Sequence, residues 1–121
     1  MKKENVVKDK SLNFAIRIVN LYKHLVSEKR ETVMSKQLLR CGTSIGANIR
    51  EAEQAQSRAD FLSKQNIALK EANETEYWLE LLMRTGYMTT IEYDSINADC
   101  VELNKLLISI IKSTKFTSEE N

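Results

Sequence analysis

Apolar residues recur along most of the chain at alternating steps of three and four, the spacing that gathers side chains on one face of an α-helix. The repeat is clearest from about residue 35 to about residue 56, where it approaches a heptad. Its members there are Leu38, Gly42, Ile45, Ile49 and Ala52. The same spacing predicts three more helices, over about residues 12–27, 57–85 and 89–112.

Local signals mark several helix ends. Ser11 is a candidate N-cap for the first helix. The segments Ser57–Asp60 and Thr89–Glu92 each pair a hydroxyl with a carboxylate three residues later, which is typical of a capping box at the start of a helix. Gly86 is suited to the left-handed conformation that ends a helix.

The chain has 121 residues, no proline and only three glycines, so it has few tight turns. Few turns and long periodic segments favour an all-α fold. Short connections make successive helices antiparallel, which predicts an up-down four-helix bundle. We expect one domain over residues 1–121, with an ordered core at about 11–113 and polar ends beyond it.

No feature predicts secretion or membrane insertion. Charges interrupt the first ten residues, and no run approaches the roughly 20 apolar residues that cross a bilayer. Cys41 and Cys100 lie inside periodic segments, so we interpret them as reduced, partly buried residues rather than a disulfide. We therefore expect a cytoplasmic protein.

Charge is distributed unevenly, although the net charge is only +1. Residues 1–58 contain 12 Lys or Arg and 6 Asp or Glu, a net of +6, whereas residues 59–121 contain 6 and 11, a net of −5. One interpretation is that a basic hairpin packs beside an acidic one, within the chain or between subunits. The other is a basic surface for phosphate.

A sparse basic line is predicted on the outside of the second helix. Its members are Lys36, Arg40, Arg50 and Arg58. In one chain this is a solvated face, but repeated by symmetry it becomes a belt that contacts phosphates. No aromatic residue interrupts it, so any RNA binding should be weakly sequence-specific and strongly salt-dependent.

Gly42 and Gly46 lie one turn apart in a helix interior, where each costs about 1 kcal/mol relative to Ala. Close packing of two helices would offset this cost. The alternative is backbone exposed to a ligand, although the segment does not match a phosphate-binding loop.

The third helix carries large apolar residues on its predicted outer face. Ile67, Trp78 and Leu81, with Tyr77 beside them, point away from its core-facing residues. A surface helix of a monomer does not ordinarily expose such a stripe. We interpret it as an oligomer interface; the alternative is that the terminal segments wrap this helix.

The residues predict no catalytic, cofactor or metal site. A di-iron bundle needs paired Glu-x-x-His motifs, and His24 is the only histidine. Asn48 and Glu76 are candidate buried polar residues. For Glu76 we expect a structural partner on the second helix (Asn48, Arg40 or Arg50), with a catalytic acid as the alternative. We therefore expect no enzymatic activity and no small-molecule substrate.

Residues 37–52 (QLLRCGTSIGANIREA), Asp60–Phe61 and residues 67–82 (IALKEANETEYWLELL) resemble the bacterial 23S rRNA intervening-sequence proteins, which are sometimes labelled ribosomal-protein-like. The resemblance implies an antiparallel four-helix bundle that assembles as a homopentamer and associates with RNA or a nucleoprotein. A related branch is the accessory protein of diversity-generating retroelements. That branch partners a reverse transcriptase and binds nucleic acid. The alternative role for this chain is a scaffold for a protein partner, such as a reverse transcriptase, without direct nucleic-acid binding.

Overall fold

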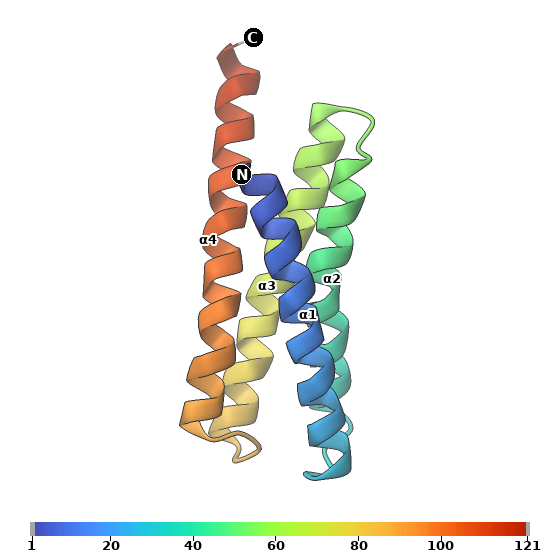
Figure 1. Ribbon diagram of the computed structural model, residues 1–121, viewed down its shortest axis with the longest axis vertical. Coiled ribbons are helices and arrows are strands. Elements are labelled where there is room, and N and C mark those ends of the chain that lie inside the picture. Colours follow the sequence, from blue (N-terminus) through green and yellow to red (C-terminus); the bar gives the residue numbers. More distant parts are fainter. Residues whose placement is uncertain (1, 121) are drawn as a thin grey trace.

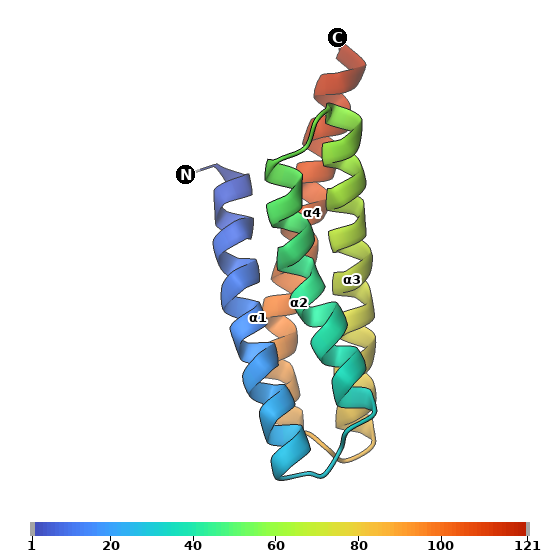
Figure 2. The same cartoon turned by 90° about the vertical axis from the view of Figure 1, so that its right-hand side faces the viewer.

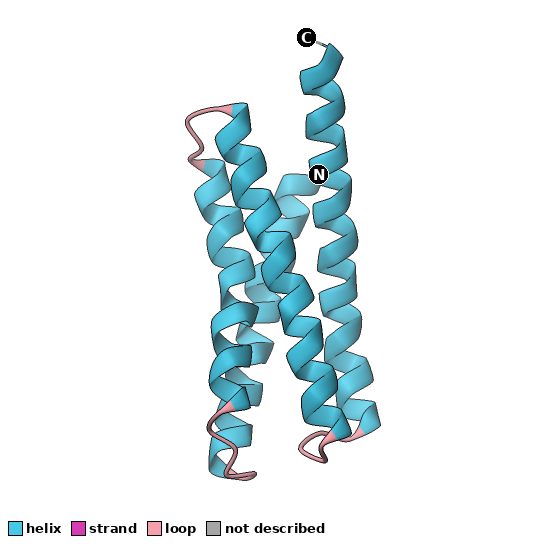
Figure 3. Ribbon diagram, turned by 180° about the vertical axis from the view of Figure 1, so that it is seen from behind, coloured by secondary structure: helices cyan, strands magenta, loops and turns pink. Residues whose placement is uncertain are grey.

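The computed structural model describes the backbone of residues 2–120 and the side chains of residues 2–116. The helices are α1 (Lys3–Ser27), α2 (Met34–Glu53), α3 (Arg58–Arg84) and α4 (Thr90–Glu120). Successive helices run antiparallel, and α4 returns beside α1, so that each helix contacts two others (Figures 1 and 2). The loops lie at the two ends of the bundle (Figure 3). The prediction of an all-α antiparallel four-helix bundle is confirmed.

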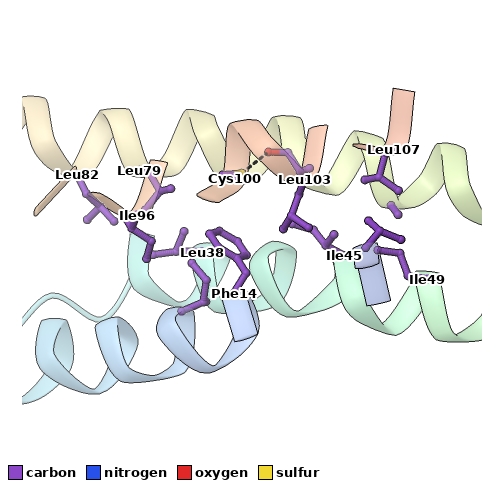
Figure 4. Packing of buried hydrophobic residues seen from close by; sticks show 14 of the residues in the cluster. Phe14, Leu38, Ile45, Ile49, Leu79, Leu82, Ile96, Cys100, Leu103 and Leu107 are labelled. Atoms are coloured by element: carbon purple, nitrogen blue, oxygen red, sulfur yellow. Dashed lines mark hydrogen bonds between the residues drawn. The ribbon is translucent and has the colours of Figure 1, made fainter. Parts of the chain in front are cut away.

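The core contains one row of side chains from each helix. Figure 4 shows Phe14 of α1, Leu38 and Ile45 of α2, Leu79 of α3 and Leu103 of α4 meeting in the interior. All of these side chains are buried, as the periodicity predicted. Among the described residues, no helix combines the length and hydropathy needed to cross a membrane.

The first helix begins at Lys3 rather than near Leu12, so this predicted boundary is wrong. Val7 is fully buried and extends the core face of α1 by two turns. Ser11 is likewise buried inside the helix, and its hydroxyl donates to the carbonyl oxygen of Lys8 at 2.9 Å instead of capping the helix. The charges around Val7 occupy the outer face of the same helix, which made the segment resemble a frayed end.

The predicted caps of α3 and α4 are confirmed. The Ser57 hydroxyl accepts from the Asp60 amide at 3.0 Å. At α4 the bonds are reciprocal: the Glu92 amide donates to the Thr89 hydroxyl at 3.1 Å, and the Thr89 amide donates to the Glu92 carboxylate at 2.8 Å. Gly86 follows α3 with φ of +88°, the left-handed conformation expected of it.

The start of α2 is capped by a residue that the sequence pattern did not single out. The carboxylate of Glu31 accepts the backbone amides of Val33, Met34 and Ser35 at 3.0, 2.9 and 2.7 Å. Burial alone would raise the pKa of Glu31, but these amide donors together lower it below the ordinary value. The carboxylate therefore stabilises the N-terminus of α2 in its ionised form.

Polar side chains, at heptad spacing on α1, close the seam between α1 and α4. The Lys3 ammonium donates to the Ser109 hydroxyl at 2.6 Å. Lys10 pairs with Glu102 at 2.9 Å, and Arg17 pairs with Asp99 at 2.7 Å. We call these three contacts the polar ladder. They join a basic helix to an acidic one inside the chain, so part of the charge difference between the two halves is neutralised internally.

The Glu31 cap generates a prediction about pH. Glu31→Gln keeps the size of the side chain but removes its charge, and we expect the free energy of unfolding to fall by about 1–2 kcal/mol near neutral pH. Because the folded-state pKa is lowered, the stabilisation is complete above the unfolded pKa of about 4.3 and is lost as pH falls through the folded pKa. Urea unfolding at a fixed protein concentration, near neutral pH and at about pH 3, measures the loss of unfolding free energy at each pH.

The matched control is Glu28→Gln, which removes an exposed charge from the same connection and should change stability by less than about 0.5 kcal/mol. An equal loss for Glu31→Gln near neutral pH and at about pH 3 would contradict the ionic cap.

Candidate interaction surfaces

The outer side of α3 exposes apolar residues. Ile67 is 38% exposed and Tyr77 is 59% exposed, and the half-buried Leu81 lines a shallow cavity together with Tyr77. We call Ile67, Tyr77 and Leu81 the α3 face. The N-terminal residues do not cover it, because they belong to α1, which does not contact α3. The described N-terminal residues therefore do not wrap α3.

Trp78 lies differently from its predicted partners. It is half-buried and packs against the core, because Thr75 and Leu82, one turn on either side, are fully buried. Its indole N–H donates to the Glu74 carboxylate at 3.2 Å, and its ring meets the ring of Tyr77 edge-on at a centroid distance of 5.1 Å. The placement of Trp78 on the outer face is therefore wrong: it lies at the margin between the core and the α3 face.

The basic line is interrupted at Arg40. Its guanidinium donates to Glu71 at 3.0 Å and also to Glu74, both on α3. The hydrogen bond to Glu74 raises the pKa of Arg40 above its ordinary value. With two carboxylates beside it, Arg40 presents no net positive charge to a phosphate. The network Trp78–Glu74–Arg40–Glu71 instead ties α2 to α3.

The other members of the basic line are exposed. Lys36 and Arg50 lie fourteen residues apart on α2, about 21 Å along its axis. Arg58 is the first residue of α3 rather than a continuation of α2. Among the described side chains, none forms an ion pair with Lys36, Arg50 or Arg58. These three cations remain available to an anionic partner.

The two helical glycines lie where α2 meets α1. A Cβ atom on Gly42 would come within 2.9 Å of both Cγ atoms of Ile18. A Cβ atom on Gly46 would lie 3.3 Å from the hydroxyl oxygen of Ser11. The backbone of α2 at Gly42 is thus covered by Ile18 and is not open to a ligand, which favours the packing interpretation over the binding one.

The predicted buried polar residues find partners other than those expected. The Asn48 side chain donates to the Ser44 carbonyl oxygen of its own helix at 2.8 Å. Glu76 is half-buried and accepts from the Asn104 amide of α4. The expected partner on α2 is therefore wrong, because Glu76 lies on the side of α3 that faces α4. Burial raises the pKa of Glu76 above its ordinary value.

Asn104 was not singled out from the sequence, although a signal for it exists. It follows Leu103 directly and Cys100 by four residues, which places it at the edge of the buried face of α4. A buried amide at such a position requires a hydrogen-bonding partner from the facing helix.

The chemically reactive side chains are poorly placed for catalysis. Burial raises the pKa of Cys41 to about 11 and raises that of Cys100 still further, so neither is a ready thiolate nucleophile. His24 is exposed on α1. In the part of the chain that the structure describes, no cluster of three His, Cys, Asp or Glu side chains could hold a metal ion.

A larger hollow opens between α1 and α4 near the α3–α4 loop. Its volume is about 450 Å³, and its apolar lining comes from Leu21, Met88, Ile91 and Ile96. Arg17, at one end of the hollow, is already engaged by Asp99 and Ser95. The hollow therefore reflects loose packing between α1 and α4 rather than a site for polar chemistry.

The structure is thus a four-helix bundle with the polar ladder between α1 and α4 and an exposed apolar face on α3. The profile of the family described as 23S rRNA-intervening sequence protein matches residues 3–109. Because the match spans most of the chain, the protein belongs to this family.

The chain is also similar to a solved structure described as a protein with unknown function from the S23 ribosomal protein family of Bacteroides thetaiotaomicron VPI-5482. The two are 77% identical with a TM-score of 0.91, over 92% of this chain and 99% of the other. Among curated proteins, none matches this chain.

The contact at Gly42 generates a prediction about stability. In Gly42→Ala the gain in helix propensity of about 1 kcal/mol competes with overpacking against Ile18, which costs about 1–3 kcal/mol. We therefore expect a net loss of up to about 2 kcal/mol in the free energy of unfolding, measured by urea titration. In the control Gly46→Ala the nearest atoms belong to Ser11, at 3.3 Å and 3.6 Å, so the variant should be as stable as the wild type or more so. A stabilised Gly42→Ala would contradict the close approach.

Proposed function

We propose that this protein is a non-enzymatic, homo-oligomeric helical bundle of the cytoplasm that binds RNA or a nucleoprotein through a surface created by assembly. The observation that carries the proposal is the α3 face, which the described residues leave uncovered. Large apolar side chains that share the outer side of a helix favour burial against a partner.

Self-association is the first part of the proposal. Ile67, Tyr77 and Leu81 lie on one side of a rigid helix, and Trp78 supports them from the margin of the core. Large aliphatic and aromatic residues of this type form the buried centres of protein interfaces. The resemblance to the intervening-sequence proteins favours a homopentamer as the assembled form.

Binding of RNA is the second part. Lys36, Arg50 and Arg58 leave three cations per chain without a carboxylate partner among the described residues. Repetition around a ring would multiply them into a belt, and neutralised phosphates would release counterions. Arg40 is paired with Glu71 and Glu74 and therefore adds no free charge to this belt. If RNA binding is absent, the alternative role as a protein scaffold is favoured.

The absence of enzymatic activity is the third part. The two thiols are buried with raised pKa values, and the half-buried carboxylate of Glu76 is paired with an amide. An activated nucleophile would instead require an adjacent base or a lowered pKa.

Self-association can be tested by light scattering at micromolar protein concentration. We expect the wild type to have a mass several times 13.9 kDa and Ile67→Glu to shift it towards the monomer, because a carboxylate buried in an apolar contact is unfavourable. The matched control is Ile108→Glu on α4, where the replaced residue is 40% exposed compared with 38% for Ile67. A monomeric wild type would overturn the proposal.

RNA binding can be tested by titrating a structured RNA at two salt concentrations. We expect weak affinity that falls steeply with salt, and we expect the triple replacement of Lys36, Arg50 and Arg58 by Gln to lower the salt slope by about 1 for each phosphate that is no longer neutralised. A control that replaces Lys29, Lys105 and Lys112 by Gln makes the same change in net charge elsewhere. No binding at low salt would exclude this part of the proposal and leave the scaffold role.

A further inference from the structure

A second apolar surface lies on the outer side of α1. Leu12 is 47% exposed and Ile16 is 52% exposed, whereas Phe14 and Ile18 between and beyond them are buried. Leu12 and Ile16 are separated by one helical turn and therefore share one side of the helix. We call them the α1 face. Residues 12–26 contain more apolar residues than one core-facing row of a helix needs, and the core uses one part of them and leaves the α1 face exposed.

The α1 face continues into a hollow between α1 and α2. A cavity of about 110 Å³ is lined by Leu12 and Ala15 of α1 and by Thr43, Gly46 and Ala47 of α2. The small side chains on α2 lower the surface here, so a protruding apolar side chain can approach both helices. Lys8 and Arg50 also line it; Lys8 is paired with Glu53 at 3.2 Å, and Arg50 has no carboxylate partner among the described side chains. The surface is thus a shallow apolar recess with one unpaired cation beside it.

The α1 face and the α3 face lie on opposite sides of the bundle. Helices α1 and α3 occupy diagonal corners, contact α2 and α4, and do not contact each other (Figures 1 and 2). Each face is formed by exposed residues on the side of its helix that points away from the bundle core. One molecule therefore presents two apolar faces in opposite directions, and it cannot bury either one against the other.

The charges of the chain favour contact between unlike faces. The α1–α2 half (residues 1–58) carries a net charge of +6, and the half that contains α3 and α4 (residues 59–121) carries −5. An α1 face against another α1 face would bring two basic halves together, and two α3 faces would bring two acidic halves together. Contact of an α1 face with an α3 face brings opposite charges together, which steers association and disfavours the like pairings.

We infer that the α1 face and its recess receive the α3 face of a second copy of this chain, so that copies associate through two different surfaces. The inference rests on the proposed self-association and specifies its partner surface. Tyr77, the most exposed member of the α3 face, is the side chain best placed to enter the recess. Such a heterologous contact leaves one unused face at each end of a growing chain, and it closes only as a ring.

Mixing of two interface variants tests this pairing. Ile16→Glu disables the α1 face and retains the α3 face, whereas Ile67→Glu does the reverse. We expect each variant alone to be monomeric by light scattering, and an equimolar mixture to form a heterodimer that grows no further, because only one working pair of faces remains. Leu12→Glu is a second α1-face variant, and Ile91→Glu, which replaces an 83% exposed residue outside both faces, is the control that keeps the wild-type mass.

The outcomes separate this inference from the proposed function. If Ile16→Glu and Leu12→Glu both keep the wild-type mass while Ile67→Glu lowers it, self-association stands and the α1 face is not its partner surface. A dimer of Ile16→Glu alone would show that α3 faces pair with each other and would overturn the inference. A monomeric wild type would overturn the proposed self-association itself. Helical circular dichroism of each variant establishes that the monomers are folded.

Discussion

The contact between Ile18 and the bare backbone at Gly42 determines how α1 sits in the bundle. With Ile18 placed directly over α2, the rotation of α1 about its axis is set: Val7, Phe14 and Leu25 enter the core, and Leu12 and Ile16 must point outward. The same contact brings the second glycine against Ser11 and leaves the small-residue recess beside it. The packing of α1 in the core and the shape of the α1 face thus both depend on the absence of a side chain at Gly42.

Most of the fold could be predicted from the sequence, because helical periodicity and capping signals are local. The boundaries that failed depend on tertiary context. The segment around Val7 is too charged to be recognised as helix until its one buried side chain meets the core. The Glu31 cap requires a loop that turns through Arg30 at φ of +58°, so that one carboxylate reaches three amides. No sequence spacing encodes that geometry.

The surfaces could be predicted only in part, for a related reason. Periodicity shows which side of a helix a residue occupies, but not which neighbouring helix it meets. The exposed cation of Arg40 therefore proved to lie between two carboxylates of α3, and the carboxylate of Glu76 turned to α4 rather than α2. Ile67 and Tyr77 were placed correctly because only the direction away from the core mattered for them.

The polar ladder gives the bundle one seam of a different kind. Helix α2 meets its neighbours through buried apolar residues as well as ion pairs such as Lys8–Glu53 and Arg40–Glu71, whereas the α1–α4 seam is loosely packed beside its hollow and is closed by the exposed pairs Lys10–Glu102 and Arg17–Asp99. Local opening should therefore begin where α1 meets α4, and amide protons along this seam should exchange with solvent sooner than those facing α2. The seams around the bundle therefore differ in strength, and the one between α1 and α4 is the weakest.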